Sequence, residues 1–304
     1  MLIVAALGGN ALVRRGEAAD LATQRRNLAA AADALAPLAR DHALILTHGN
    51  GPQIGLLALQ SEQGAGSRAL PLDVLGAESE GLIGYLIEQD IANRLPGREV
   101  ATLLTRVVVD AADPAFAAPT KPIGPVYGEA DARRLAAERG WRVAADGAHF
   151  RRVVASPEPR RIIELRTIRL LVDHGVVVVC AGGGGIPVAT DEAGAARGVE
   201  AVIDKDLAAA LLARDVGADV LLLLTDVPAV YDDWPEPAMR PLRDATPRGL
   251  RARRFAEGSM APKIEAACRF VESGGRFAAI GALADAARLL RREAGTIVAA
   301  DPTR

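Results

Sequence analysis

The sequence predicts an α/β protein with an open, largely parallel sheet between two layers of helices. Short runs of Val, Ile and Leu alternate along the 304 residues with longer segments of helical periodicity, and this pattern is typical of parallel strands joined by crossover helices. No period of about 20 to 50 residues repeats, and no low-complexity linker interrupts the chain. We therefore expect a single domain, 1–304, with one continuous sheet.

The expected strands are short, apolar and followed by glycine or turn residues. The first of them starts at the N-terminus without a basic segment or a cleavage pattern, so it resembles a strand and not a signal peptide. In chain order the strands are Leu2–Leu7, Ala43–Thr47, Val100–Val108, Val176–Cys180, Val220–Thr225, Phe277–Ile280 and Thr296–Ala299. The expected helices are Leu21–Arg40, Val74–Arg94, Glu129–Arg139, Arg161–His174, Lys205–Val216, Pro262–Ser273 and Ala284–Arg292.

One segment breaks the alternation. Residues 111–160 contain many prolines and few long apolar runs. Because proline removes a ladder donor and fixes φ, we expect an ordered excursion from the sheet, in the form of a small protruding subdomain. Long ordered excursions in compact folds are more often functional than incidental.

Composition narrows the classes of partner. The net charge of −2 and the pI near 6.1 provide no basic face for nucleic acid or an anionic membrane. The longest apolar stretch, VVVVCAGGGGIPVA, is too short and too rich in glycine to cross a bilayer. Cys180 and Cys268 match no metal or redox spacing, so we interpret both as buried apolar residues. We expect a cytoplasmic protein with a small-molecule partner and without histidine ligands to a metal.

Glycine-rich loops follow three of the expected strands. They are GGN at Gly8, Gly9 and Asn10, HGNGPQ at 48–53 with Gly49, Asn50 and Gly51, and AGGGGIP at 181–187 with Gly183 and Gly184. In an open parallel sheet, ligands bind at the carboxyl ends of the strands, and glycine lets backbone amides approach an anion. Three such loops indicate phosphate binding. No P-loop, complete dinucleotide fingerprint or protein-kinase motif is present.

Lysine is rare and restricted in position. Only Lys121, Lys205 and Lys263 occur among 36 basic Lys and Arg residues, and each lies in a Gly/Pro-rich motif or at an expected helix start. A lysine carries a compact charge on a flexible stem, which can follow a phosphoryl group as it moves. Since phosphoryl transfer depends mainly on positioning and positive charge, these lysines are candidate catalytic residues.

These motifs together resemble the carbamate kinases of the amino acid kinase family. The resemblance spans almost the whole chain, through ALGGNAL, THGNGPQIG, VDAADPAFAAPTKPIGPVY, AGGGGIPV, EAVIDKDLAAALLA, LLTDVPAVY and GSMAPKIEAA. The PTKPIGP excursion and the pairing of IDKD with GSMAPK point to carbamate kinase within that family. One departure is Ala261, where the family motif usually has glycine; because it precedes proline, we expect an extended residue and tolerance of the methyl group.

The resemblance implies a fold, a reaction and a set of roles. The fold would be an open sheet of about eight strands, with the protein working as a homodimer. The reaction would be reversible phosphoryl transfer between carbamoyl phosphate and ADP, giving ATP and carbamate, with Mg²⁺ held mainly by the nucleotide phosphates. Lys205, Lys263 and Lys121 would neutralise the phosphoryl group, and Asp206 would position two of the lysines. The glycine loops in the N-terminal part would bind carbamoyl phosphate, and residues 200–304 would bind the nucleotide through Thr225, Asp226, Val227, Tyr231, Met260 and Pro262.

Two alternative functions and several structural interpretations stay open at this point. The chain could be another amino acid kinase, acting for instance on acetylglutamate or UMP, or a catalytically silent nucleotide-binding regulator. Glu78 and Glu80 resemble a solvated helix face, and His48 a loop residue with a hydrogen-bonding role. The apolar pairs Leu82/Leu86 and Ile83/Ile87 fit either a dimer interface or the core of the monomer.

Overall fold

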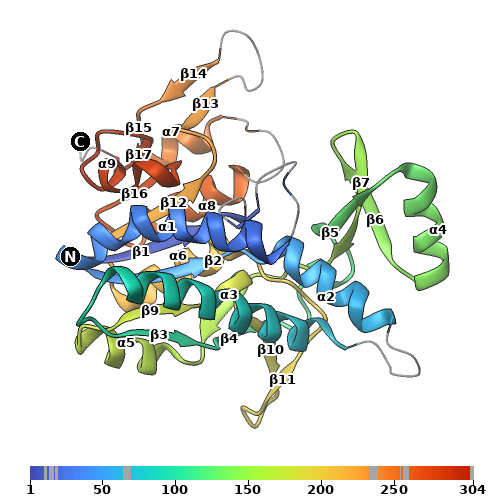
Figure 1. The fold of residues 1–304 in the computed structure, drawn as a ribbon. Helices are drawn as coiled ribbons and strands as arrows, with labels where there is room; N and C mark the ends of the chain where they lie inside the picture. The colour runs from blue at the N-terminus through green and yellow to red at the C-terminus, as the bar shows by residue number, and fades with distance from the viewer. Residues whose placement is uncertain are drawn as a thin grey trace.

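A largely parallel eight-stranded sheet forms the centre of the protein (Figure 1). The computed structural model describes residues 1–9, 12–13, 17, 20–63, 70–232, 239–253, 255 and 260–301. The strands run in the spatial order β15-β17-β16-β12-β1-β2-β9-β3, and β16 and β17 are the only antiparallel neighbours. Their bounds are β1 Leu2–Leu7, β2 Ala43–His48, β3 Val100–Leu103, β9 Val177–Cys180, β12 Val220–Thr225, β15 Asp244–Ala245, β16 Phe277–Ala282 and β17 Thr296–Val298. The predicted fold class is confirmed.

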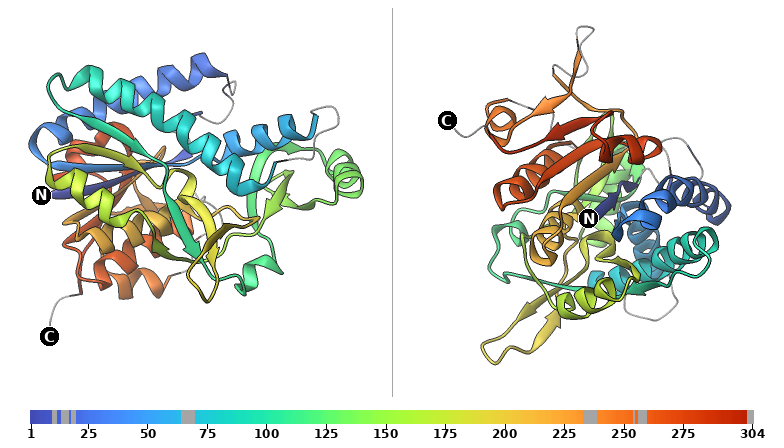
Figure 2. Two further views of the ribbon diagram at one scale, coloured as in Figure 1. Left: turned by 90° about the horizontal axis from the view of Figure 1, so that it is seen from below. Right: turned by 90° about the vertical axis from the view of Figure 1, so that its left-hand side faces the viewer.

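Helices cover both faces of this sheet, as the two views in Figure 2 show. Within the described residues they are α1 Leu21–Asp41, α2 Gly51–Gln63, α3 Leu72–Arg94, α4 Glu129–Arg139, α5 Leu165–Asp173, α6 Lys205–Val216, α7 Pro247–Arg251, α8 Met260–Glu272 and α9 Ala286–Leu290. The bounds of α4 and α6 agree with the sequence prediction to the residue. None of the described helices is long and apolar enough to cross a membrane.

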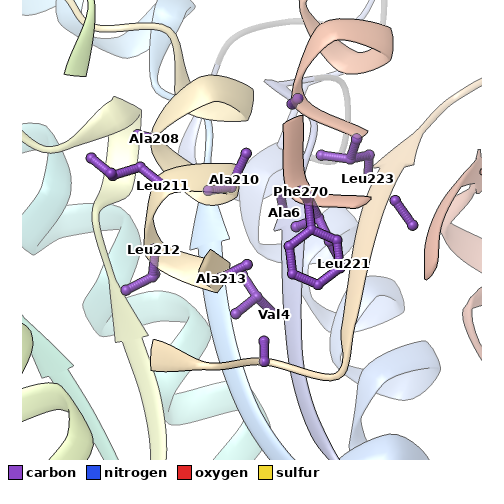
Figure 3. Packing of buried hydrophobic residues seen from close by; sticks show 14 of the residues in the cluster. Val4, Ala6, Ala208, Ala210, Leu211, Leu212, Ala213, Leu221, Leu223 and Phe270 are labelled. Atoms are coloured by element: carbon purple, nitrogen blue, oxygen red, sulfur yellow. The ribbon is translucent and has the colours of Figure 1, made fainter. Parts of the chain in front are cut away.

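Alternate side chains of each strand point to opposite faces of the sheet, so the sheet has a separate buried core on each face. Val4 and Ala6 of β1 point toward α6 and α8, whereas Ile3 and Ala5 point toward α1 and α3. Figure 3 shows the first core, where Leu212 of α6 and the other labelled side chains of that helix lie with Phe270 of α8 over the sheet. Strands that are apolar on both sides are the consequence of a sheet buried on both faces. Cys180 and Cys268 are buried in the first core, as expected.

The prediction of one continuous sheet is wrong, because the described chain forms three further sheets. One contains β11 (Ala196–Gly198), β10 (Ile186–Thr190), β4 (Arg106–Val109) and β8 (Pro159–Ile162). A second pairs β13 (Val230–Asp232) with β14 (Arg240–Leu242). The third contains β5 (Lys121–Tyr127), β7 (His149–Val154) and β6 (Arg142–Asp146).

Two predicted elements are divided by these additional sheets. The strand expected at Val100–Val108 is two strands, since β3 pairs with β9 in the central sheet and β4 pairs with β8 and β10. The helix expected at Arg161–His174 starts only at Leu165, because residues 159–162 form β8. In the first case, an apolar run does not reveal where the chain leaves one sheet for another. In the second, the short strand β8 has the sequence PRRI, which carries no strand pattern.

The segment around Lys121 stands away from the central sheet. The three strands β5, β7 and β6 and helix α4 project to one side, where α2 lies against β5 (Figure 1). The approach is closest at two glycines: a Cβ placed on Gly55 of α2 would lie 1.9 Å from Cα of Gly124. Trp141 Nε1 also donates to Glu62 of α2 over 3.3 Å. We retain the term protruding subdomain for residues 111–160.

The start of α8 differs from the sequence expectation. Ala261 was expected to be extended because it precedes Pro262, but it lies in the first turn of α8, which begins at Met260. Proline is tolerated there because amides of the first helical turn have no intrahelical acceptor. The same argument applies to α2, which was not predicted because HGNGPQ is rich in glycine and contains a proline. Pro52 lies in the first turn of this helix, where proline is tolerated.

Candidate active site

Four loops meet at one edge of the central sheet. The strands β12, β1, β2 and β9 are adjacent and parallel, so their carboxyl ends lie together. Residues 8–9 follow β1, residues 49–51 follow β2, residues 181–185 follow β9 and residues 226–227 follow β12. Helices α6 and α8 each precede a strand of this sheet, which brings their N-termini to the same edge. The sheet topology therefore places glycine loops and two helix N-termini around one region.

A cluster of lysines and aspartates occupies the start of α6. Asp206 is 3% exposed, and its two oxygens bind two different ammonium groups: Oδ1 lies 2.5 Å from Nζ of Lys205, and Oδ2 lies 3.1 Å from Nζ of Lys263. Lys263 comes from the first turn of α8, 57 residues away along the chain. A single carboxylate thus fixes the separation of two ammonium groups from two helices.

The neighbouring carboxylate holds the third lysine. Asp204 caps α6, where Oδ1 accepts hydrogen bonds from the amides of Asp206 and Leu207 over 2.9 and 3.3 Å. Its Oδ2 lies 2.5 Å from Nζ of Lys121 of β5. Three ammonium groups and two carboxylates are thereby combined, which leaves an excess of positive charge where a phosphoryl group could bind.

Burial and charge pairing alter the pKa values in this cluster. Burial lowers the pKa of Lys205 to about 8, with Asp206 acting in the opposite direction and Lys263 adding to the decrease. For Asp204, burial raises the pKa, but the charge and hydrogen bond of Lys121 outweigh it and hold the pKa below its ordinary value. A lysine pKa this close to neutrality makes the charge of the cluster dependent on pH near 8.

The lysine cluster is in contact with the glycine loops. A Cβ on Gly49 would lie 3.1 Å from the amide nitrogen of Gly9 and 3.4 Å from Cδ of Lys205. Gly8 donates its amide to the carbonyl oxygen of Leu224 over 2.9 Å, directly before Thr225. Contacts therefore link the loop after β2 to the loop after β1 and to the side chain of Lys205. The loop after β1 is in turn bonded to the end of β12.

The predicted phosphate-binding glycines divide into two groups. A Cβ added at Gly9 or Gly51 would have no atom of the described residues within 4 Å, so these residues leave the backbone open to a ligand there. At Gly183 a Cβ would lie 2.1 Å from the amide nitrogen of the Asn50 side chain, and the amide of Gly184 already donates to Ala181. The geometry favours Gly9 and Gly51 for anion contact, and it gives the buried loop 181–185 a packing function.

Three of the remaining predicted substrate-loop residues can be placed and one cannot. Asn50 is 4% exposed, and its side-chain amide donates to Oγ of Ser79 on α3 over 2.8 Å. Asn10 lies outside the described residues, as do Gly258 and Ser259 of the GSMAPK motif. Gly8 and Gly49 use their amides to continue the sheet, through Leu224 and Leu7.

The predicted nucleotide residues lie on the β12 side of this edge. Thr225 ends β12, and its hydroxyl donates to Oδ1 of Asp226 over 3.1 Å. Val227 follows in the same loop, and Tyr231 lies on β13. Met260 and Pro262 are half-buried in the first turn of α8, next to Lys263.

Two buried acids, Asp204 and Glu80, were not identified from the sequence. Of the two aspartates in IDKD, only Asp206 was assigned a role. Glu80 was interpreted as part of a solvated helix face, but it is fully buried, and it accepts hydrogen bonds from the amides of Thr105 and Gly182. Its spacing from Gly76 and Ile83 on α3 is helical, and both are buried, which is the signal that could have identified it. Glu78 is exposed, as expected.

His48 has the local hydrogen bond that was expected of it. Its Nδ1 lies 3.1 Å from the carbonyl oxygen of Gly49, and because a carbonyl only accepts, Nδ1 carries the proton. Burial lowers the pKa of His48 to about 4, so the ring is neutral. Nε2 has no hydrogen-bond partner within the part of the chain that the structure describes.

Comparison with known proteins agrees with this fold. The sequence model of the amino acid kinase family matches residues 1–281. A carbamate kinase from Rhizobium meliloti (strain 1021) is 54% identical over 302 residues, covering 98% of this chain and 93% of the relative. A carbamate kinase from Haemophilus influenzae is 49% identical over 297 residues, covering 97% of this chain and 96% of the relative.

Solved structures give the same result. Carbamate kinase from Giardia lamblia bound to citric acid superposes with a TM-score of 0.93 at 38% identity, covering 99% of this chain and 98% of the other. The same enzyme bound to AMP-PNP gives a TM-score of 0.89 at 38% identity, again covering 99% and 98%. The chain belongs to the amino acid kinase family. Within that family it belongs to the carbamate kinases, and it is a kinase.

Proposed function

We propose that this chain catalyses reversible phosphoryl transfer between carbamoyl phosphate and ADP, as an ATP:carbamate phosphotransferase. An oxygen of the ADP β-phosphate attacks phosphorus, and a new P–O bond forms as the bond between phosphorus and the carbamoyl oxygen breaks. The electron pair of that bond leaves with carbamate, which decomposes to ammonia and carbon dioxide. The observation that supports this most strongly is the carboxylate of Asp206 between the ammonium groups of Lys205 and Lys263.

The lysines act by positive charge and position. Lys205 and Lys263 neutralise the oxygens of the phosphoryl group as it moves, and Asp206 keeps their ammonium groups in register. Lys121 adds a third charge from the protruding subdomain. The attacking oxygen is already anionic in either direction of transfer, so the chain needs no general base.

The two substrates bind on opposite sides of these lysines. Carbamoyl phosphate lies on the N-terminal side, at Gly8, Gly9, Asn10, Gly49, Asn50 and Gly51. The nucleotide lies on the side of residues 200–304, at Thr225, Asp226, Val227, Tyr231, Met260 and Pro262. The AMP-PNP complex of the Giardia lamblia relative supports a nucleotide site in this fold.

Magnesium fits this site as an ion carried by the nucleotide. Among the described residues, no three His, Cys, Asp or Glu side chains gather closely enough to hold a metal ion, and Asp204 and Asp206 are both paired with lysines. The nucleotide phosphates would supply most of the ligands for Mg²⁺. When bound, the ion neutralises phosphate charge and helps orient the phosphates.

The chain is also expected to work as a homodimer, as its resemblance to carbamate kinases implies. Ile83, Leu86 and Ile87 are buried in the core of the monomer, so of the two apolar pairs on α3 only Leu82 is exposed enough to contribute to an interface. The molar mass in solution, measured by light scattering during gel filtration, tests this. The mass of a single 31.7 kDa chain would contradict it.

The direct test of the reaction is ATP formation from a panel of phosphoryl donors and acceptors. We expect the purified protein to form ATP from carbamoyl phosphate, ADP and Mg²⁺, and to transfer no phosphoryl group from ATP to acetylglutamate or UMP. Phosphorylation of either alternative acceptor would identify a different amino acid kinase. Binding of ADP without turnover of any substrate would identify a regulator.

A further inference from the structure

Glu80 connects three elements that the site depends on. Its side chain comes from α3 and is fully buried. Oε2 accepts a hydrogen bond from the amide of Thr105, in the link between β3 and β4, over 3.1 Å. Oε1 accepts one from the amide of Gly182, in the loop after β9, over 2.8 Å. Thr105 extends the connection, because its hydroxyl accepts from the amide of Ala181 over 3.0 Å.

The loop held in this way has an unfavourable backbone conformation. Ala181 has a φ of +50°, and Gly183, Gly184 and Gly185 have φ values of +67°, +96° and +84°. Left-handed conformations are costly for a residue with a side chain, and they persist only where the surroundings fix them. The hydrogen bonds from Ala181 to Thr105 and from Gly182 to Glu80 fix two consecutive amides of this loop.

The same loop lies between the two sides of the site. At Gly183 a Cβ would clash with the side chain of Asn50, from the loop after β2, and at Gly184 it would lie 2.5 Å from the carbonyl oxygen of Ile203. Ile203 directly precedes Asp204 and Lys205. A shift of the loop must therefore move Asn50, the backbone before Lys205, or both.

A buried carboxyl group is expensive to retain without a function. Burial raises the pKa of Glu80 to about 8, although the hydrogen bonds from Thr105 and Gly182 oppose that increase. An apolar side chain would avoid this cost, but it would leave two buried amides without acceptors. The two hydrogen bonds account for the presence of an acid at this position.

We propose that Glu80 is a positioning residue, which holds the loop 181–185 against α3 and thereby keeps Asn50 and Lys205 in register for phosphoryl transfer. The kinetic part of this inference depends on the proposed function, whereas the structural part does not. Glu80 acts through the loop and touches no reacting atom.

Three variants and one control test this proposal. Glu80→Gln keeps one acceptor oxygen, and Glu80→Ala keeps none. Gly182→Ala displaces the loop from the other direction, since its Cβ would lie 2.2 Å from Nε2 of His48 and 3.0 Å from Cγ of Glu80. Glu78→Gln changes an exposed acid on the same helix and serves as the matched control.

Two measurements separate positioning from stability alone. The first is deuterium exchange of the amides of residues 181–185, which we expect to accelerate in all three variants and to be unchanged in Glu78→Gln. The second is kcat at saturating substrates, well below each Tm and normalised to protein that binds ADP. We expect a decrease of about threefold to tenfold for Glu80→Gln and a larger one for Glu80→Ala, with nucleotide affinity unchanged.

Each outcome is decisive. Unchanged exchange at residues 181–182 in Glu80→Gln would overturn the proposal, as would wild-type kcat in a variant whose loop exchanges faster. If Glu80→Ala fails to fold, the same two measurements on Glu80→Gln and Gly182→Ala test the proposal. If the wild type forms no ATP, the proposed reaction fails, and the exchange measurement alone decides whether Glu80 holds the loop.

Discussion

Lys121 binds Asp204 across 83 residues of chain, with Nζ 2.5 Å from Oδ2. This ion pair connects β5 of the protruding subdomain to the N-terminal cap of α6. The same carboxylate therefore has two functions: it caps the helix that starts with Lys205, and it determines where the third lysine lies.

Substitutions of Asp204 separate these two functions. Asparagine is a good N-cap, so Asp204→Asn should keep the start of α6 and lose the charge that holds Lys121. We expect a Tm close to that of the wild type and a kcat lower by at least about tenfold. Asp204→Ala should in addition lose about 1 kcal/mol of stability with the cap. Equal activity of Asp204→Asn and wild type would show that the reaction does not depend on the ion pair between Lys121 and Asp204.

Lys205→Arg tests whether the shape of the cation is important. Arginine keeps the charge, but its planar fork favours one bidentate geometry, and the site around Lys205 is buried between Gly49 and Asp206. We expect a folded protein that binds ADP and loses at least about 99% of kcat, a loss of about 3 kcal/mol of transition-state stabilisation. Full activity of this variant, measured as ATP formed from carbamoyl phosphate, would exclude the proposed role of Lys205.

The rate should decrease as the pH rises through about 8. Burial lowers the pKa of Lys205 to about 8, so the ammonium form predominates below that pH and is lost above it. If the charged form carries the transfer, kcat/KM is highest on the acid side of this pKa, because kcat/KM reports the groups of the free enzyme. A profile of kcat/KM between about pH 6 and pH 9.5 checks the sign. Residual activity of Lys205→Arg should show no such decrease, because arginine stays charged throughout.

Gly55→Ala should detach the protruding subdomain from α2. The added Cβ would lie 1.9 Å from Cα of Gly124, and backbone cannot move aside as a flexible side chain can. Displacing β5 moves Lys121 away from Asp204, so we expect kcat to decrease by at least about tenfold while the central sheet stays folded. Gly81→Ala is the control, since it is also helical and its Cβ would only approach Leu104 at 3.9 Å. Equal losses in both variants would contradict this account.

Much of the fold could be predicted from local pattern. The observed bounds of β1 and β12 are the predicted ones, residue for residue. Strands that are buried on both faces are continuous apolar runs, which makes their ends easy to recognise. The position where the chain leaves the central sheet could not be predicted. At Thr105 the amide donates to Glu80 and not to a neighbouring strand, and nothing in the apolar run around it indicates this.

The candidate site was only partly visible in the sequence. The rarity of lysine indicated Lys121, Lys205 and Lys263 as candidates, and the structure pairs all three with two aspartates that flank Lys205 in the sequence. The helical spacing of Glu80 from Gly76 and Ile83 indicates the buried face of α3. The hydrogen-bond partners of Glu80 could not be predicted, because they lie 25 and 102 residues away along the chain.

Asp206→Asn gives the most direct test of the central claim, that one carboxylate positions two lysines for phosphoryl transfer. The measurement is the rate of ATP formation from carbamoyl phosphate and ADP, on protein whose ADP binding shows that it is folded, with Asp215→Asn at the far end of α6 as the control. We expect Asp206→Asn to lose at least about 99% of the rate, because Lys205 and Lys263 then repel each other without a shared anion. A rate equal to that of the wild type would contradict the account.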